Sequence, residues 1–410
     1  MPATIRPKSS LLPLAARTAG ILAGGLALTA GTYLLRNTTY ARVDRARAER
    51  AGLTLRTTMI NGHRIRFAEG PDSGPALVLL PGQVSDLWNY ARVMCDLSRD
   101  FHVYAVDVPG HGGSEHDPEL YSGAVLGELF ADFIAGVVGE QAIVSGHSSG
   151  GLIAAWIAAS RPEVVAALVL EDPPFFSSAL PAAEKTANHV DLATTAHAFL
   201  TEHGSALDAA DPPAGDPFAA DPPAGDPFAT EPPAGDPFAA EPRAGDPRGA
   251  DFVAFYAAHT PMLDMFGDLG PRMRARARAQ RAADPQRSVR WALMPPVLNE
   301  YFRGMGDYDP RFGQAFFDGS FHDHFDHALT LAAISAPTLL IHCNWFHDED
   351  GVLMAAMSGE DAERARELIP DVRFERVDSG HAFHFEHPRR YARLLREFAA
   401  DTLDEVDLLD

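Results

Sequence analysis

Short apolar runs alternate with helical segments through most of the chain, and this alternation restricts the fold more than any other feature. Runs such as 76–82 (ALVLLPG) and 167–172 (ALVLED) are separated by helix-like stretches such as 151–160. Strands that are apolar along their whole length are typical of a parallel sheet covered by helices on both faces. An Asn61-Gly62 dipeptide before them predicts a hairpin turn. We therefore expect an α/β protein with a mostly parallel sheet.

The alternation stops after Asp172 and resumes only at Pro337. The roughly 160 residues between them are mostly helical in pattern, with apolar clusters at 252–265 and 291–302. We interpret these clusters as core, with the lining of an apolar pocket as the alternative. An insertion of this size after the sixth strand predicts a helical cap over the carboxyl edge of the sheet.

The insertion contains a tandem repeat of ten residues, which occurs four times between 211 and 250 (DPPAGDPFAA and its variants). Proline recurs too often there for a helix or a strand. Between Thr201 and Ala250, ten acids stand against two arginines. Such a segment is expected to be disordered or an extended tether. We favour a linker, with binding through the repeated Asp-Pro-Phe as the alternative.

The expected organisation is an N-terminal hydrophobic segment and linker (1–52), the core in two parts (53–174 and 331–410), and a cap (175–330) that contains the repeat region 208–250.

The N-terminal segment Thr18–Leu35 contains 18 residues without a charge and follows Arg6, Lys8 and Arg17. Eighteen helical residues just reach across a hydrocarbon core of about 30 Å. We favour a membrane anchor, and a cleaved secretion signal or a helix packed on the domain remain alternatives. Arginines follow the segment as well, so its orientation stays open. The expected location is the membrane, or the outside of the cell if the segment is cleaved.

Charge and cysteine content exclude some classes of function. The formal net charge is -22, which argues against a nucleic-acid partner because such partners need basic surfaces. Cys95 and Cys343 are the two cysteines, too few for a disulfide framework and without a zinc-like pattern. We expect a small-molecule substrate and no nucleic acid.

Residues 146–150 (GHSSG) fit the pattern G-x-S-x-G between a predicted strand and a predicted helix. In this pattern the serine lies on a tight turn that exposes its hydroxyl, and the small residues let the turn close. We therefore predict that Ser148 is a nucleophile. A serine hydroxyl needs a base, and His381 in the Asp-Ser-Gly-His segment after the last predicted strand is our candidate. His384 and His387 are interpreted as surface residues.

The base needs a carboxylate to hold its tautomer. The loop after 338–343 (TLLIHC) contains Asp348, which we favour as this acid. The neighbouring Glu349 and Asp350 are alternatives, as is Asp172 at the end of the preceding strand. An oxyanion intermediate also needs two N–H donors. We expect them from Ser149 and from Gln83, which follows Pro81-Gly82 at the end of an apolar run.

Taken together, these motifs resemble the α/β-hydrolase superfamily of the serine-nucleophile type. The matching segments are ALVLLPGQ (76–83), DVPGHGGS (107–114), GHSSGG (146–151), LVLEDPP (168–174), APTLLIH (336–342) and DSGH (378–381). The resemblance covers about residues 54–175 and 330–400 and implies the fold and a Ser-His-acid triad. Two departures are Pro81, where the family has histidine, and the altered loop around Asp348.

The resemblance and the residues predict a serine hydrolase, by default a carboxylic ester hydrolase acting on an apolar small molecule through an acyl-enzyme. Alternatives are a cofactor-free haloperoxidase, a carbon–carbon bond hydrolase, and a membrane-tethered binding protein without turnover. No metal or cofactor is needed for this chemistry. The cluster between His322 and His327 (HDHFDH) looks metal-like, but its spacing matches no known ligand set, and we interpret it as a polar stretch.

Overall fold

The computed structural model describes residues 12–208, 251–285 and 287–406; within this range the side chains of 12–30, 205–208 and 404–406 are not described. The repeat predicted at 208–250 therefore lies almost entirely outside the described residues, and its expected disorder stays a prediction. The strands are β1 (Thr54–Ile60), β2 (His63–Glu69), β3 (Ala76–Leu80), β4 (His102–Val106), β5 (Ala142–His147), β6 (Val165–Glu171), β7 (Thr338–His342) and β8 (Val372–Arg376).

The helices are α1 (Leu12–Arg50), α2 (Ala91–Leu97), α3 (Gly123–Phe133), α4 (Ser149–Ser160), α5 (Thr194–Asp208), α6 (Phe252–His259), α7 (Gly270–Ala283), α8 (Pro296–Gly304), α9 (Pro310–Asp318), α10 (His327–Ala333), α11 (Gly359–Leu368), α12 (Phe383–Glu386) and α13 (Pro388–Val406).

One eight-stranded sheet has the order β1-β2-β4-β3-β5-β6-β7-β8. The pairs β1–β2 and β2–β4 are antiparallel, and all other neighbours are parallel. The predicted hairpin is confirmed: Asn61 and Gly62 both have positive φ, as a two-residue turn of this kind requires. The mostly parallel sheet predicted from the apolar runs is thus observed.

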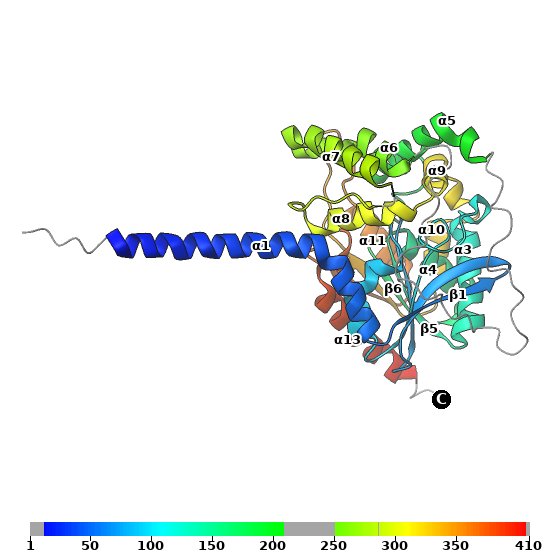
Figure 1. Cartoon of the computed structure of the whole chain (residues 1–410). Coiled ribbons are helices and arrows are strands. Elements are labelled where there is room, and N and C mark those ends of the chain that lie inside the picture. The colour runs from blue at the N-terminus through cyan, green and yellow to red at the C-terminus, as the bar shows by residue number, and fades with distance from the viewer. Residues whose placement is uncertain (1–11, 209–250, 286, 407–410) are drawn as a thin grey trace, which may run out of the picture.

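Helices cover both faces of the sheet (Figure 1). In β3, Leu77 and Leu79 pack with α2 and α13, whereas Val78 and Leu80 pack with α3 and α4. Successive side chains of a strand point to opposite faces, so a strand buried on both faces must be apolar throughout. This is why the sequence shows continuous apolar runs. The carboxyl ends of the parallel strands all reach one edge of the sheet.

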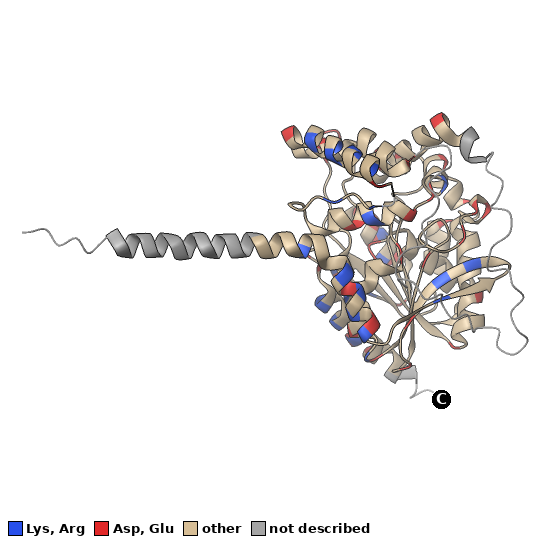
Figure 2. Ribbon diagram, viewed as in Figure 1, with Lys and Arg blue, Asp and Glu red and all other residues tan. Residues whose placement is uncertain are grey.

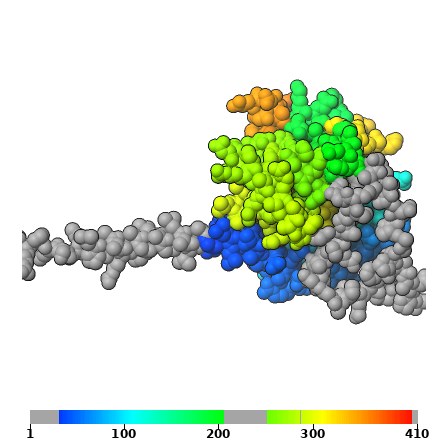
Figure 3. Space-filling model, turned by 45° about the horizontal axis from the view of Figure 1, so that its top comes forward, coloured from blue at the N-terminus to red at the C-terminus, as the bar shows by residue number. Residues whose placement is uncertain are grey.

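The cap predicted after the sixth strand is present: α5 to α10 lie between β6 and β7. Its aromatic residues Phe252, Tyr256, Trp291 and Phe302 are buried and belong to the same core cluster as β3 and α4. The core interpretation is therefore confirmed for these aromatic residues, whereas Met265 and Leu293 of the same segments are exposed. In the space-filling view (Figure 3), cap residues coloured green to yellow cover much of one face, beside the first described residues of α1.

The last part of α1 packs on the body of the protein, which corrects the expectation that 1–52 is a segment and linker outside the globule. Asn37, Tyr40, Asp44 and Ala48 are all buried. These positions recur every three or four residues, so they form one face of the helix. Figure 2 shows Lys and Arg on this part of α1 and along α7.

The side chains of most of Thr18–Leu35 lie outside the described residues. Among the residues that the structure describes, no helix is long and apolar enough to cross a membrane. The anchor therefore remains a prediction.

Candidate active site

Ser148 occupies a strained turn between β5 and α4. Its φ of 55° and ψ of -123° are unusual for a residue with a side chain. Strain of this kind persists only where the surroundings enforce it. Here the Ser148 N–H donates to the Glu171 carbonyl at 3.0 Å, which joins the turn to β6.

Glycines allow this turn to close against the end of β3. A side chain on Gly146 would collide with the Gly150 carbonyl, and one on Gly150 would collide with the Leu80 carbonyl. A Cβ atom on Gly82 would lie 2.8 Å from Cβ of Ser148. The G-x-S-x-G pattern is therefore a packing requirement, as predicted.

His381 lies in the loop between β8 and α12, and its ring is paired with Asp172. The Nδ1 atom of His381 is 2.7 Å from Oδ2 of Asp172, which follows β6 directly. The side chain of Asp172 is 2% exposed, and that of His381 is 42% exposed. Oδ1 of Asp172 accepts the Cys343 N–H at 3.1 Å. A buried, anchored carboxylate thus holds the ring of a histidine that solvent can reach.

This geometry corrects our choice of Asp348 as the acid. The Asp348 carboxylate is exposed and accepts the N–H groups of Asp350 and Val352 within its own loop. Glu349 and Asp350, the neighbouring alternatives, are exposed too. The structure pairs His381 with Asp172, the alternative from the end of the preceding strand.

His381 and Asp172 shift each other's pKa so that the charged form of each is favoured. Burial lowers the pKa of His381, but the hydrogen bond and the charge of Asp172 outweigh it and raise this pKa above its ordinary value. Burial likewise opposes ionisation of Asp172, yet the nearby ring of His342 and the hydrogen bond from His381 hold the pKa of Asp172 below the usual range. Asp172 therefore stays a carboxylate and accepts a hydrogen bond from Nδ1–H, which leaves Nε2 of neutral His381 as the basic atom.

No hydrogen bond joins the Ser148 hydroxyl to His381 in the part of the chain that the structure describes. Such bonds are often long before substrate binds.

The expected oxyanion donors lie on either side of this turn. Ser149 is the first residue of α4, so its N–H has no partner within the helix. Gln83 follows Gly82, whose backbone approaches Ser148 closely. Its side-chain amide is buried and forms no hydrogen bond within the described chain. Their roles remain predictions.

A buried ionic network holds the loop that contains Gln83; we call residues 81–86 the oxyanion flank. Asp86 accepts two hydrogen bonds from Arg303 of α8, at 2.6 and 2.7 Å. Arg303 also pairs with Glu300 at 2.6 Å, and Glu300 accepts the Tyr40 hydroxyl of α1 at 2.8 Å. Burial opposes ionisation of Asp86, but Arg303 holds its pKa below the ordinary value.

The cap also touches this flank through backbone. Val84 has a positive φ of 58°, and a side chain on Gly304 of α8 would collide with its carbonyl oxygen. The flank is therefore held by α8, which α1 contacts in turn through Tyr40 and Glu300.

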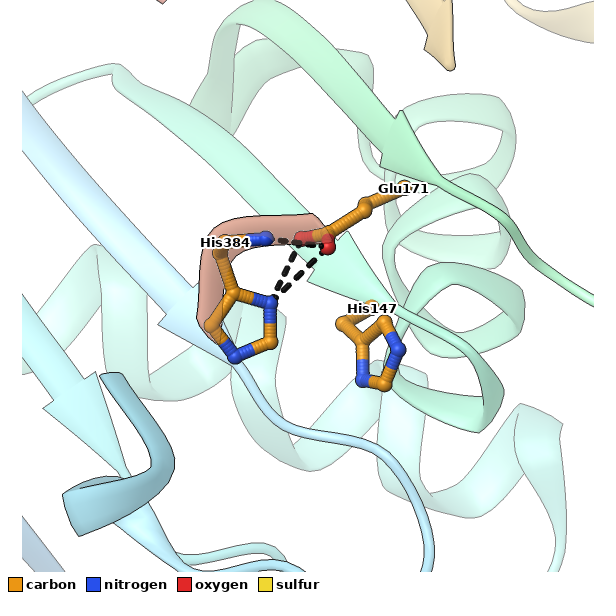
Figure 4. Close-up of side chains that lie close together, drawn as sticks. All are labelled: His147, Glu171 and His384. Carbon is orange, nitrogen blue, oxygen red and sulfur yellow. Dashed lines mark hydrogen bonds and ion pairs between the residues drawn. The ribbon is translucent and has the colours of Figure 1, made fainter. Parts of the chain in front are cut away.

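A second polar cluster lies buried beside His381 and was missed by the sequence analysis (Figure 4). It contains His147, Glu171 and His384, all shielded from solvent. His384, interpreted from the sequence as a surface residue, is wholly buried; His387 is exposed as expected. One signal existed: Glu171 is an acid inside an otherwise apolar strand, and a buried acid needs a partner.

These three residues are the group that could hold a metal ion among the described residues, since one ligand atom from each lies within 4.8 Å of the others. Hydrogen bonds already occupy several of these atoms. The predicted polar stretch 322–327 is not such a group. His322 contacts the Ser178 carbonyl at 3.0 Å, and Nδ1 of His327 accepts the Phe176 N–H at 2.8 Å.

The comparisons with known proteins agree with this architecture. Residues 75–203 match the family model for the alpha/beta hydrolase fold. The dihydrolipoyllysine-residue acetyltransferase component of an acetoin cleaving system from Cupriavidus necator is 32% identical over 141 residues, covering 33% of this chain and 37% of that protein. A pimeloyl-[acyl-carrier protein] methyl ester esterase from Chromobacterium violaceum is 39% identical over 104 residues, covering 25% and 39%. These matches span less than two fifths of either relative.

Solved structures extend the likeness over almost the whole chain. The structure of a membrane phospholipase A, described as a bacterial virulence factor, aligns with a TM-score of 0.53 and 22% identity, covering 96% of this chain and 98% of that one. At this identity the likeness concerns the fold. The family match over residues 75–203, the sheet order and the strained serine turn together show that the chain has the alpha/beta hydrolase fold.

Proposed function

We propose that this protein is a serine hydrolase that cleaves carboxylic esters of apolar small molecules. The observation that carries the proposal is the strained turn of Ser148 beside a histidine whose ring is anchored by a buried carboxylate. Strand–serine–helix turns expose a nucleophile, and a His–Asp pair supplies its base. The esterase among the partial relatives supports this choice of bond.

In the proposed mechanism, Nε2 of His381 removes the proton of the Ser148 hydroxyl as its oxygen attacks the ester carbonyl. The N–H groups of Gln83 and Ser149 stabilise the negative charge that develops on the carbonyl oxygen. His381 returns the proton to the leaving alcohol, and an acyl-enzyme remains. His381 then activates water, which releases the acid. Asp172 stabilises the imidazolium formed in both steps.

The test is hydrolysis of p-nitrophenyl esters of increasing acyl length, together with the rate of labelling by a fluorophosphonate. Ser148→Ala should lower kcat by at least about 10⁴-fold, because the nucleophile is lost. Ser149→Ala is the matched control: it removes a neighbouring hydroxyl but keeps the backbone N–H, so activity should stay within about tenfold of wild type.

Other outcomes would replace the proposal. A wild type that labels but hydrolyses no ester, and that halogenates in the presence of peroxide, favours the haloperoxidase alternative. Labelling with turnover only of a carbon–carbon substrate favours the carbon–carbon hydrolase. If neither ester hydrolysis nor labelling occurs, the chain is better described as a binding protein.

We also propose that Thr18–Leu35 tethers the protein to a membrane. The support is its 18 residues without charge, preceded by basic residues. The test compares the full chain with a variant lacking residues 1–30, which keeps the buried face of α1. Full-length protein should stay in membranes after a carbonate wash, and the shortened one should not. Release of both, or a mature N-terminus beyond Leu35, contradicts the tether.

A further inference from the structure

The last strand residue Glu171 and its neighbour Asp172 each hold a histidine of one short segment. Asp172 binds the ring of His381, and Glu171 binds His384, three residues further on. Glu171 ends β6, whereas Asp172 lies just outside the strand with a positive φ of 46°. The two acids hold the segment 381–384 at two separate points.

Glu171 holds His384 through both its backbone and its ring. Oε1 of Glu171 accepts the His384 N–H at 2.9 Å, and Nδ1 lies 2.9 Å from each carboxylate oxygen. Both side chains are fully buried. Nε2 of His384 is hydrogen bonded to the side chain of Asn89, and the ring stacks on Tyr90 at 4.2 Å. The position of the His384 ring is thus fixed by Glu171, Asn89 and Tyr90 together.

A third contact comes from the residue before the nucleophile. Nε2 of His147 donates to the His381 carbonyl at 3.0 Å. Burial lowers the pKa of His147 well below its ordinary value, so the ring is neutral and carries one proton for this bond. The backbone of His381 is therefore tied to the turn that carries Ser148.

These contacts matter because the His381 ring itself is 42% exposed. The ring contacts the His147 ring, at 4.6 Å between centroids, and its position also depends on Asp172 and on the His381 backbone. A misplacement of about 1 Å between reacting groups can cost on the order of 100-fold in rate.

We propose that Glu171 and His384 form a positioning pair, which holds the backbone of 381–384 so that Nε2 of His381 stays in line with Ser148. The pair touches neither substrate nor Ser148 and acts through His381. The inference rests on the proposed function, since its readout is the reactivity of Ser148.

The experiment measures fluorophosphonate labelling rate and ester kcat and KM for the full chain. Glu171→Ala removes both hydrogen bonds to His384 and should lower labelling rate and kcat by about 100-fold, with KM changed less than about threefold. Glu171→Gln keeps an oxygen that accepts them, so its rates should return to within about tenfold of wild type. Both variants remove the carboxylate of Glu171, but only Glu171→Ala also removes the hydrogen bonds to His384.

If Glu171→Ala does not fold, His384→Phe is measured instead, because it keeps a ring to stack on Tyr90 but loses the ring hydrogen bonds. Tyr391→Phe is the control: it removes a buried hydrogen bond between Tyr391 and Ser145 (2.6 Å) but keeps the ring that contacts Phe383 and His384. It should lower the melting temperature but not the labelling rate.

Each outcome separates this inference from the proposed function. A wild type that does not label contradicts the proposed function. Labelling at wild-type rate in Glu171→Ala or His384→Phe, or equal losses in Glu171→Ala and Glu171→Gln, overturns the positioning pair. Loss of wild-type labelling with 1,10-phenanthroline and its return with Zn²⁺ also overturns it, because the cluster would then be a metal site.

Discussion

The two flanks of Ser148 are fixed by different parts of the molecule. The base flank, the loop carrying His381, is held by side chains at the ends of β5 and β6: His147, Glu171 and Asp172. The oxyanion flank is held by Arg303 of α8, which binds Asp86 of the flank. Arg303 also binds Glu300, and Glu300 accepts a hydrogen bond from Tyr40 of α1. One flank depends on the sheet, and the other depends on the cap and the N-terminal helix.

This difference indicates how each flank should respond to change. The contacts of the base flank arise from the sheet, so they are established once the sheet forms. The contacts of both flanks join segments far apart in the chain, but those of the oxyanion flank involve three elements outside the sheet: α1, the loop 81–86 and the cap. Mutations on the base flank should alter rates, and mutations on the oxyanion flank should alter stability first.

The largest expected effect is on the base flank. Asp172→Asn should lower kcat by about 10⁴-fold, because the amide can no longer stabilise the imidazolium or fix the productive tautomer. Asp348→Asn should leave kcat near wild type, since that side chain bonds only its own loop. Measuring kcat for ester hydrolysis by Asp172→Asn and Asp348→Asn decides which acid supports His381. Equal rates in both, or a loss confined to Asp348→Asn, would contradict the assignment of the acid.

On the oxyanion flank, Arg303→Met should destabilise the protein by about 3–5 kcal/mol, because Asp86 and Glu300 are left buried without their counterion. Arg366→Met is the control, since its pair with Glu363 is exposed to solvent and should leave the unfolding midpoint close to that of wild type. Urea unfolding measures both. Similar unfolding midpoints would show that the network does not hold the fold.

The smallest expected effect is on pH dependence. In the proposed mechanism only neutral His381 accepts the serine proton, and the pKa of His381 is raised by Asp172. The acidic limb of kcat/KM should therefore lie above pH 6.5, with activity falling about tenfold per pH unit below it. The same raised pKa stabilises the fold fully below about pH 6.5, and this contribution is lost as pH rises through the folded-state value. A limb at or below pH 6.5 would show that Asp172 does not govern this ring.

The sequence predicted the sheet, the hairpin at Asn61-Gly62 and the serine turn, because each leaves a local pattern, whereas the role of His381 as base remains a prediction. It favoured Asp348 over Asp172 as the partner of His381 because both acids follow neighbouring parallel strands whose ends meet at one edge. Spacing along the chain does not tell which of the two reaches His381. That choice depends on side-chain direction in three dimensions.

Two further misses have related causes. His384 looked like a surface residue because nothing in its local pattern distinguishes it from His387. The buried face of α1 was overlooked because Asn37, Tyr40 and Asp44 are polar, so no apolar stripe marks it. Polar groups can be buried where partners from distant segments satisfy them, and those partners are invisible to a local pattern.

The contact between Gly304 and Val84 has a mechanical consequence. With no room for even a methyl group between them, α8 and the loop before Asp86 are in direct backbone contact, and Arg303 binds them together. Any motion that lifts the cap to admit a large substrate must pull on this loop. The open and closed states of the cap would then differ in how well the Gln83 N–H points toward the proposed oxyanion position. Substrate entry and alignment of the oxyanion donor would therefore be coupled.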